Sequence, residues 1–373
     1  MTTDKRRELL ERLWTDAVAA VGGYSAVNNH LDTTKIAPPS RILAVGKAAS
    51  GMAEGALAHF PGTPTLVVTK TNHSSVALRE CAGVTVIESA HPVPDENSLR
   101  GGAALLDIAS GATADEHILL LVSGGASSLA ESLTEGADLD TLKALNSEML
   151  SQGLTIGAMN ARRKNLSHIK DGKLISASSA RFTVLAISDV EGDDIATIGS
   201  GIGDPRRAPE RANATLIATN RIARDQAAHT ATALGLTVLR NAETLYDDVY
   251  ALAPQLGETI RNSGPGVLIW GGEPTVVLPD NPGRGGRNQA LALATAEHLS
   301  GLNRVSLLVA GTDGTDGPTD AAGGLVDGDT WRETARDALA RADAGTELAA
   351  CGALFTSGPT NTNVMDIAIA LVE

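Results

Sequence analysis

His117–Ser128 reads HILLLVSGGASS, an aliphatic run followed directly by a turn of serines and glycines. A continuous apolar run of this length is typical of a strand that is buried on both faces, as in a parallel sheet. The turn offers backbone N–H groups and hydroxyls where a helix pattern begins, which suits an anion such as phosphate. Because the G-x-S-x-G pattern of serine hydrolases is absent, we favour phosphate binding over a nucleophilic serine. The candidate residues are Ser123, Gly124, Gly125, Ser127 and Ser128.

Three further strand patterns end in candidate binding residues. Arg41–Val45 (RILAV) runs into the sequence GKA, and two later aliphatic runs end near Lys70 and His91. Open α/β sheets bind ligands at the carboxyl ends of their strands, so Lys47, Lys70 and His91 are site candidates. Two alternatives stay open: Lys47 as a solvated lysine at a helix start, and His91 as a hydrogen-bonded turn residue. The GKA step is not a Walker A loop, because Ala48 replaces the Ser or Thr that would hold Mg²⁺.

Two acidic loops follow aliphatic runs. The first, SDVEGDD, contains Asp189, a candidate general base or Mg²⁺ ligand, although acids of this loop can also cap a helix. The second, GTDGTDGPTDAAG at 311–323, holds Asp313 and Asp316 on either side of Thr315. These two acids could ligate Mg²⁺ or accept a hydroxyl proton, and a turn held by aspartate side chains is the alternative. No glutamate closes an EF-hand loop.

A basic cluster lies within and after residues 139–169, which read as mostly helical. In an acidic chain such a cluster could face an anionic ligand, although a solvated helix face is the commoner meaning. The cluster comprises Arg162, Arg163, Lys164, Lys170 and Lys173.

Trp270–Ala294 reads WGGEPTVVLPDNPGRGGRNQALALA and carries the strongest anion-binding pattern of the second half. Glu273 ends an apolar run, and a short extended segment is expected over Thr275–Leu278. Arg284 and Arg287 then lie among three glycines, directly before a helix pattern. A guanidinium is planar and permanently charged, and a helix start adds partial positive charge, so this loop suits a carboxylate or phosphate. A surface hairpin with solvated arginines is the alternative.

The length of 373 residues exceeds what one hydrophobic core usually organises, so we expect two domains. Apolar residues make up 43% of the chain and aromatic residues 2%, which indicates aliphatic cores of buried strands under Ala- and Leu-rich helices. A helix over Thr215–Leu234 and a strand over Thr237–Arg240 complete the first domain. We place the domains at 1–242 and 243–373.

The net charge of −14 argues against binding to nucleic acid or anionic membranes, although local Lys and Arg residues can still bind a small anion. Cys81 and Cys351 show neither a disulfide nor a metal-ligand spacing, and we expect both to be buried. No apolar run approaches the ~20 residues of a membrane span. The first ~25 residues, which begin MTTDKRRELLERLW, predict an amphipathic helix rather than a signal peptide, which favours a cytoplasmic protein.

Taken together, these motifs resemble those of the glycerate 2-kinases of the MOFRL type, some of which are labelled hydroxypyruvate reductases. The resemblance covers essentially the whole chain, and GRGGRNQ with GTDGTDGPTDAAG is its most specific part. The motifs occur in the order VGKAA (45–49), HPVPD (91–95), SGGASS (123–128), RRKNLSHIKDGKL (162–174), SDVEGDD (188–194), GGEPTV (271–276), GRGGRNQ (283–289), GTDGTDGPTDAAG (311–323) and SGPTNTNVMD (357–366).

The resemblance implies an α/β protein with a Rossmann-like, doubly wound N-terminal domain, a smaller mixed α/β C-terminal domain and an active site in the interdomain cleft. It implies phosphorylation of D-glycerate at the 2-hydroxyl, with ATP and Mg²⁺. Lys47 and Arg287 match the positions held to be catalytic, and we expect Asp189 to act as the base or as a Mg²⁺ ligand. The expected metal residues are Asp189, Asp313 and Asp316. The expected nucleotide or substrate residues are Ser123, Gly124, Gly125, Ser127, Ser128, Lys70, His91, Glu273, Arg284 and Thr315.

The chain departs from the family pattern at several loop positions. Glu191 replaces a proline, Asn361 replaces a glycine and Met365 replaces an asparagine, so a close analogue of glycerate is an alternative acceptor. One rival is a hydroxypyruvate reductase, against which the absence of G-x-G-x-x-G speaks. The other is a non-catalytic binding protein on the same scaffold. The sequence leaves a homodimer open.

Overall fold

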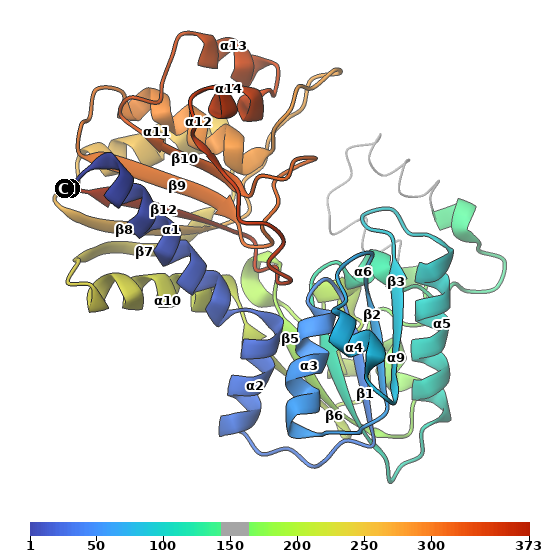
Figure 1. Cartoon of the computed structure of the whole chain (residues 1–373). Helices are drawn as coiled ribbons and strands as arrows, with labels where there is room; N and C mark the ends of the chain where they lie inside the picture. The colour runs from blue at the N-terminus through green and yellow to red at the C-terminus, as the bar shows by residue number, and fades with distance from the viewer. Residues whose placement is uncertain (143–163) are drawn as a thin grey trace. The chain divides into compact units, whose positions relative to one another are not determined.

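The computed structural model describes residues 1–142 and 164–373 (Figure 1). Contacts between residues divide this part of the chain into two compact units. The Rossmann-like unit comprises Val21–Thr219 with Asn361–Asn363, and the mixed-sheet unit comprises Met1–Ala20, Asn220–Thr360 and Val364–Glu373. This division differs from the predicted boundary after residue 242, because the first helix and the segment from residue 220 pack with the second sheet.

The Rossmann-like unit is built on a parallel sheet of six strands in the order β3-β2-β1-β4-β5-β6. This order is that of a doubly wound Rossmann sheet, which confirms the predicted fold class. From β1 the next strands, β2 and β3, are added on one side, whereas from β4 the strands β5 and β6 are added on the other. The strands β1 and β4, which pair in parallel, therefore flank the topological switch point. The strands are β1 (Arg41–Val45), β2 (Thr65–Lys70), β3 (Val84–Ser89), β4 (His117–Val122), β5 (Arg181–Ile187) and β6 (Ala212–Ala218).

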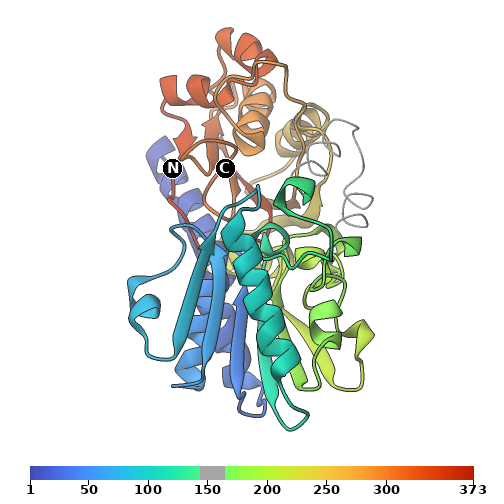
Figure 2. The same cartoon turned by 90° about the vertical axis from the view of Figure 1, so that its right-hand side faces the viewer.

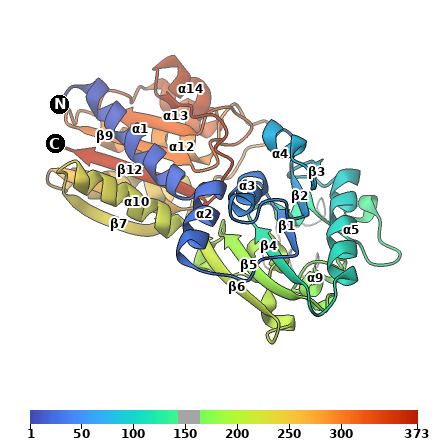
Figure 3. The ribbon, with the colours of Figure 1, turned by 60° about the horizontal axis from the view of Figure 1, so that its bottom comes forward.

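Helices cover both faces of this parallel sheet. α2 (Gly23–Thr33) and α3 (Ala49–His59) pack together on one face, and α5 (Glu96–Gly111) runs along the other (Figures 2 and 3). Every residue of β4 is buried, as its uninterrupted aliphatic sequence predicts. The shorter helices are α4 (Val76–Glu80), α6 (Ala126–Leu129), α9 (Lys173–Ser176), η1 (Glu191–Asp193), η2 (Ile198–Gly201) and η3 (Pro205–Arg207).

The mixed-sheet unit also contains six strands, in the order β11-β10-β9-β12-β8-β7. Only β7 and β8 pair in parallel, and all other neighbours are antiparallel. The strand β12 lies near the centre, paired on one side with β8 and on the other with β9. The strands are β7 (Val238–Leu245), β8 (Gly266–Gly272), β9 (Val305–Gly311), β10 (Gly323–Asp327), β11 (Leu354–Phe355) and β12 (Asp366–Val372).

Two groups of helices enclose the mixed sheet (Figures 1 and 3). α1 (Thr3–Ala20) and α10 (Asn220–Ala233) pack against each other and against one face of the sheet. Arg6 anchors α1, because its Nε donates to Ser306 Oγ at 3.1 Å and its Nη1 pairs with Glu373 at 3.1 Å. The other group consists of α11 (Val249–Arg261), α12 (Arg287–Leu299), α13 (Thr334–Ala340) and α14 (Ala344–Ala350).

Three local predictions are wrong. Residues 215–218 belong to β6 rather than to a helix, because they pair with β5, and α10 begins only at Asn220. Within Thr275–Leu278 only Thr275 makes a strand-like bridge, to Asp248. Cys81 is exposed and Cys351 half-buried, since each follows the end of a short surface helix.

Two further points concern segments singled out by sequence. Most of the predicted helix over 139–169 lies outside the described residues. Among the helices of the described ranges, none is long and apolar enough to cross a membrane.

Candidate active site

The loops after β1 and β4 are joined at the switch point of the parallel sheet. Lys47 N donates to Gly124 O at 2.9 Å, and Ala48 N donates to Ser123 Oγ at 3.0 Å. Gly46 has φ +125°, and a Cβ at this position would lie 2.2 Å from Ser123 Oγ. Only glycine fits this approach, so the GKA and SGG sequences form one connected structure.

Three predicted functional side chains surround the SGG turn. A Cβ on Gly124 would lie 2.1 Å from Asp189 Oδ2. A Cβ on Gly125, which has φ +80°, would lie 3.1 Å from His91 Nε2 and 3.2 Å from Lys47 Cγ. The missing side chains therefore let a carboxylate, an imidazole and a lysine stem come close to the turn. We call Lys47, His91, Ser123–Gly125 and Asp189 the turn cluster.

Backbone N–H groups of the turn, rather than its serine hydroxyls, are available to a ligand, because the hydroxyls already have partners. Ser123 Oγ accepts from Ala48 N, Ser127 Oγ contacts Ser200 Oγ at 2.8 Å, and Ser128 Oγ donates to Gly125 O at 3.2 Å. By contrast, the N–H groups of Gly124 and Gly125 have no hydrogen-bond partner among the described residues. Two such N–H groups in succession form a recess that suits a phosphate oxygen. Lys70 ends β2 at the same edge of the sheet.

A second cluster of predicted residues is built around Arg287, the first residue of α12. Arg287 Nε donates to Asp366 Oδ2 at 2.6 Å, and its Nη1 lies 2.9 Å from Glu273 Oε1. Burial lowers the pKa of Arg287, but the charge of Asp366 and the hydrogen bond that it accepts outweigh burial and hold this pKa above its usual value. The guanidinium therefore stays charged although its side chain is only 34% exposed.

Asp316 caps the helix that Arg287 begins. Its Oδ1 accepts from Asn288 N at 3.1 Å and its Oδ2 accepts from Gln289 N at 2.8 Å. The cap position itself is Gly286, where a Cβ would lie 2.3 Å from Asp316 Cγ, so a distant aspartate supplies what a local side chain cannot. Burial raises the pKa of Asp316 to about 6, against the opposing effect of these N–H donors. We call Glu273, Arg287, Asn288, Asp316 and Asp366 the arginine cluster.

The other predicted residues of this unit have local roles. Asp313 Oδ1 accepts from Thr315 N at 3.0 Å, which is the aspartate-held turn that the sequence left open. Arg284 is exposed, and its backbone holds the loop: its N–H donates to Asp343 Oδ1 at 2.9 Å, and its carbonyl accepts from Gly345 N at 2.8 Å. These contacts give the backbone of Arg284 a structural role in the loop and leave its side chain exposed.

The acids differ in their suitability for a metal ion. Within the described ranges no three His, Cys, Asp or Glu residues are grouped to hold one. Both carboxylate oxygens of Asp316 already accept from the start of α12, and Asp313 accepts from its own turn. Asp189, beside the open turn, has the better position for a carboxylate that contacts Mg²⁺. One or two carboxylates are enough when phosphates and water supply the remaining ligands.

The described lysines of the basic cluster are structural. Lys170 forms a buried ion pair with Glu131, and Lys173 Nζ donates to Lys164 O at 2.6 Å and to Ser167 O at 2.8 Å. Lys164 Nζ donates to Ala196 O at 3.1 Å. These lysines therefore form neither the predicted anion site nor a solvated helix face, because they bind backbone carbonyls and a buried acid. Arg162 and Arg163 lie outside the described residues.

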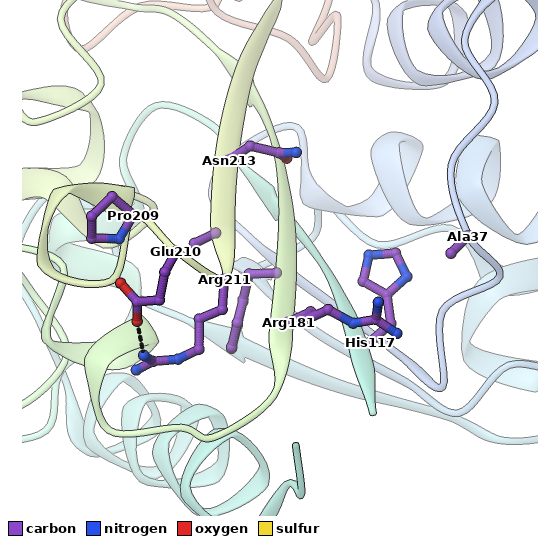
Figure 4. A pocket seen from close by; sticks show the side chains of 9 residues that line it. Ala37, His117, Arg181, Pro209, Glu210, Arg211 and Asn213 are labelled. Atoms are coloured by element: carbon purple, nitrogen blue, oxygen red, sulfur yellow. Dashed lines mark hydrogen bonds and ion pairs between the residues drawn. The ribbon is translucent and has the colours of Figure 1, made fainter. Parts of the chain in front are cut away.

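A cavity of about 290 Å³ lies at the opposite, amino edge of the parallel sheet (Figure 4). It is lined by His117, Arg181 and Arg211, and Arg211 is paired with Glu210. No predicted site residue lines this cavity, which separates it from the turn cluster at the carboxyl edge.

Sequence reasoning missed Asn288 and Asp366. Asp366 appeared only as the end of a polar loop, yet it is the first residue of β12, and its carboxylate is buried against Arg287. The available signal was an aspartate directly before an aliphatic strand, where a charge needs a buried partner. The two departures Asn361 and Met365 have φ of +57° and +67°, a region open to glycine and tolerant of asparagine. A glycine at position 361 or an asparagine at position 365 would adopt this backbone conformation with less strain.

Two family models and several known proteins match this chain. A model of a domain of unknown function, DUF4147, matches residues 9–234, and a model of the MOFRL family matches residues 266–366. The glycerate 2-kinase of Pyrococcus horikoshii is 32% identical over 98% of this chain and 97% of its own length. A putative hydroxypyruvate reductase of Agrobacterium vitis is 34% identical over 98% and 94%.

A solved structure gives the same result for the fold. The crystal structure of a glycerate kinase from Thermotoga maritima superposes with a TM-score of 0.88 at 31% identity, covering 99% of this chain and all of the other, 100%. The similarity therefore extends over both units and over the segments that carry the two clusters.

Proposed function

Since this chain belongs to the glycerate kinases of the MOFRL type and is an enzyme of the kinase class, we propose that it phosphorylates D-glycerate at the 2-hydroxyl with ATP. The products are 2-phosphoglycerate and ADP. The observation that carries this proposal is the turn cluster, where Lys47, His91 and Asp189 surround two unpaired backbone N–H groups. A lysine, N–H donors and a carboxylate at the switch point of a Rossmann-like sheet are suited to phosphoryl transfer.

The turn cluster is assigned the nucleotide and the proton transfer. The N–H groups of Gly124 and Gly125 receive phosphate oxygens, and Lys47 neutralises the transferring group. The oxygen of the 2-hydroxyl forms a bond to the γ-phosphorus while the bond to the β-phosphate oxygen breaks, and Asp189 accepts the hydroxyl proton. Mg²⁺, when bound with the nucleotide, would offset phosphate charge, and contact with this ion is the alternative role of Asp189. His91 and Lys70 are assigned to the same phosphates.

The arginine cluster is assigned the acceptor. Arg287 presents a charged guanidinium whose Nη2 makes no hydrogen bond within the described residues. A planar guanidinium matches the carboxylate of glycerate or an oxygen of the phosphoryl group in flight. The carboxylate of Glu273 also pairs with this guanidinium, so a substrate anion would compete with Glu273 for Arg287. Asp316 supports the helix start rather than a metal ion, and Thr315 and Asp313 shape the adjacent turn.

The reductase alternative meets a physical obstacle in the loop after β1. In a dinucleotide-binding fingerprint, a second glycine lets the backbone approach the pyrophosphate. Here that position is Ala48, which is fully buried, and Ser123 occupies the space beside Gly46. The loop therefore lacks the glycine that would let its backbone approach the pyrophosphate of a nicotinamide cofactor.

A coupled assay tests the proposal. ADP release is measured with D-glycerate, L-glycerate and several C4 hydroxy acids, and the phosphate position in the product is read by NMR. We expect D-glycerate to give 2-phosphoglycerate, and Lys47→Met to lower kcat at least ~10²-fold, equivalent to about 3 kcal/mol of transition-state stabilisation. NADH oxidation with hydroxypyruvate and no ADP from any acid would overturn the proposal, as would near-normal turnover by Lys47→Met.

A further inference from the structure

The mixed-sheet unit holds a buried carboxylate, that of Asp366, which has no role in the proposed reaction so far. Asp366 is 1% exposed, yet it ends a polar loop and begins the central strand β12. A buried carboxylate is costly unless it is paired and hydrogen-bonded. Its pairing with Arg287 is therefore a feature of the site that needs an explanation.

The backbone around Asp366 is anchored on every side. In the sheet register Asp366 lies opposite Gly272 on β8 and Gly311 on β9. A Cβ on Gly311 would lie 3.2 Å from Asp366 Oδ1, so glycine leaves the room that the carboxylate occupies. Asn220 Nδ2 donates to Asp366 O at 3.0 Å and to Val364 O at 2.9 Å. The carboxylate is thus mounted on a rigid element, which is more precise than a loop.

Both oxygens of this carboxylate act on the start of α12. Oδ2 accepts from Arg287 Nε at 2.6 Å, and Oδ1 accepts from Asn288 Nδ2 at 2.9 Å. Asn288 in turn is tied to Asp316 through its backbone N–H. Because Asp366 binds Nε and Glu273 lies 2.9 Å from Nη1, the guanidinium plane is held at two of its three nitrogens. The contact at Nε leaves Nη2 for an anion.

We propose that Asp366 is a positioning residue that sets the plane of the Arg287 guanidinium for phosphoryl transfer. This inference rests on the proposed kinase reaction. An arginine without this partner would sample other rotamers, and a misplacement of about 1 Å at a reacting group can cost ~10²-fold in rate. In this proposal Asp366 affects the reaction through Arg287, whose Nε donates to its carboxylate.

A double-mutant cycle tests the proposal in the full-length enzyme. The variants are Asp366→Asn, Arg287→Ala and the double variant, with Glu297→Gln as the control. Glu297 forms a 2.6 Å ion pair with Arg336 on the surface of α12, so the control removes a carboxylate–arginine pair from the same helix without touching the cluster. We expect Asp366→Asn to lower kcat/KM for glycerate about 10- to 100-fold and to leave the KM for ATP within about twofold.

The coupling between the two residues decides the outcome. We expect the double variant to match Arg287→Ala, because Asp366 has no function once the guanidinium is absent. Asp366→Asn activity within about twofold of wild type, alongside a strongly impaired Arg287→Ala, would overturn the inference and leave the proposed function intact. So would a double variant reduced by the product of both single effects.

A second measurement tests the inference on the wild-type enzyme, so that it holds even if Asp366→Asn does not fold. In the wild-type enzyme, the Nε–H resonance of Arg287 is identified by its loss in Arg287→Lys, and its exchange with solvent is followed by NMR. Slow exchange supports the fixed guanidinium, and exchange as fast as that of an exposed arginine overturns it. Since this readout needs no turnover, it separates failure of the inference from failure of the kinase reaction, which absence of ADP release from the wild type would reveal.

Discussion

The turn cluster and the arginine cluster solve the same problem by opposite means. At the turn, glycines remove side chains so that backbone N–H groups stay open and Lys47, His91 and Asp189 can come close. At the start of α12, buried side chains are added around Arg287, and carboxylates compensate its charge. The turn cluster depends on glycines that have no side chain, and the arginine cluster depends on paired charges. The two should therefore respond differently to substitution.

The largest effect is expected at Gly124. Gly124→Ala places a Cβ 2.1 Å from Asp189 Oδ2, so either the turn or the carboxylate must move. We expect kcat/KM to fall at least ~10²-fold in the ADP-release assay, because a group that reacts or binds phosphate is displaced.

A matched control for Gly124→Ala is Gly111→Ala, since a Cβ on Gly111 meets no atom within 4 Å and this residue ends α5 in the same unit. We expect this variant to keep wild-type kinetics. If both variants were equally active, the close approach of backbone and carboxylate would have no catalytic meaning.

An intermediate effect is expected in the pH dependence of stability at Asp316. Its pKa is raised to about 6 in the folded chain from 3.8, mainly by burial, so the folded state binds the proton more tightly. The stabilisation by this proton is present below the unfolded pKa and is lost as the pH rises through about 6. The total change is about 3 kcal/mol, from about 1.4 kcal/mol for each pKa unit.

Urea unfolding of the wild type and Asp316→Asn between pH 4 and 7 measures this change. The asparagine does not titrate, so the wild type should lose stability relative to the variant as the pH rises. A constant difference across this range would show that Asp316 does not titrate there. A loss of stability confined to the wild type would sharpen the comparison, because it would identify a titrating buried carboxylate in the arginine cluster.

The smallest effect is expected in the loop support behind the arginine cluster. Ala342 follows α13 with φ +53°, and the hydrogen bonds Ala342 N to Leu339 O and Asp343 N to Ala338 O form a Schellman motif. Glycine is favoured at this position, so Ala342→Gly should raise the free energy of unfolding by up to about 1 kcal/mol.

The control for that substitution is Ala340→Gly, at an exposed position two residues earlier in the last turn of α13. A glycine there should lower stability by up to about 1 kcal/mol, because the position is helical. Thermal or urea unfolding distinguishes the two signs. Destabilisation by Ala342→Gly would show that contacts of the alanine methyl group outweigh the backbone conformation.

Much of the Rossmann-like unit was predictable because its signals are local. Aliphatic runs such as HILLLV predict buried parallel strands, and the glycine loops directly after them predict the binding edge. The lysine at 47 and the aspartate at 189 each follow a strand, so their place at the same edge follows from the direction of the strands. The basic residues Lys164, Lys170 and Lys173 carried no such signal, and their contacts with carbonyls and Glu131 required the folded chain.

The amino-acid sequence by itself determined the fold class, the family and the catalytic candidates, because these depend on patterns within a few consecutive residues. Only the tertiary structure decided which acid serves which arginine. Asp366 lies 79 residues from Arg287, and Asp316 lies 28 residues from Asn288. Sheet pairing and helix packing bring these groups together, and no local pattern encodes a contact between charges so far apart in the chain. Burial then gives the contact its strength, because a charge removed from water needs its partner.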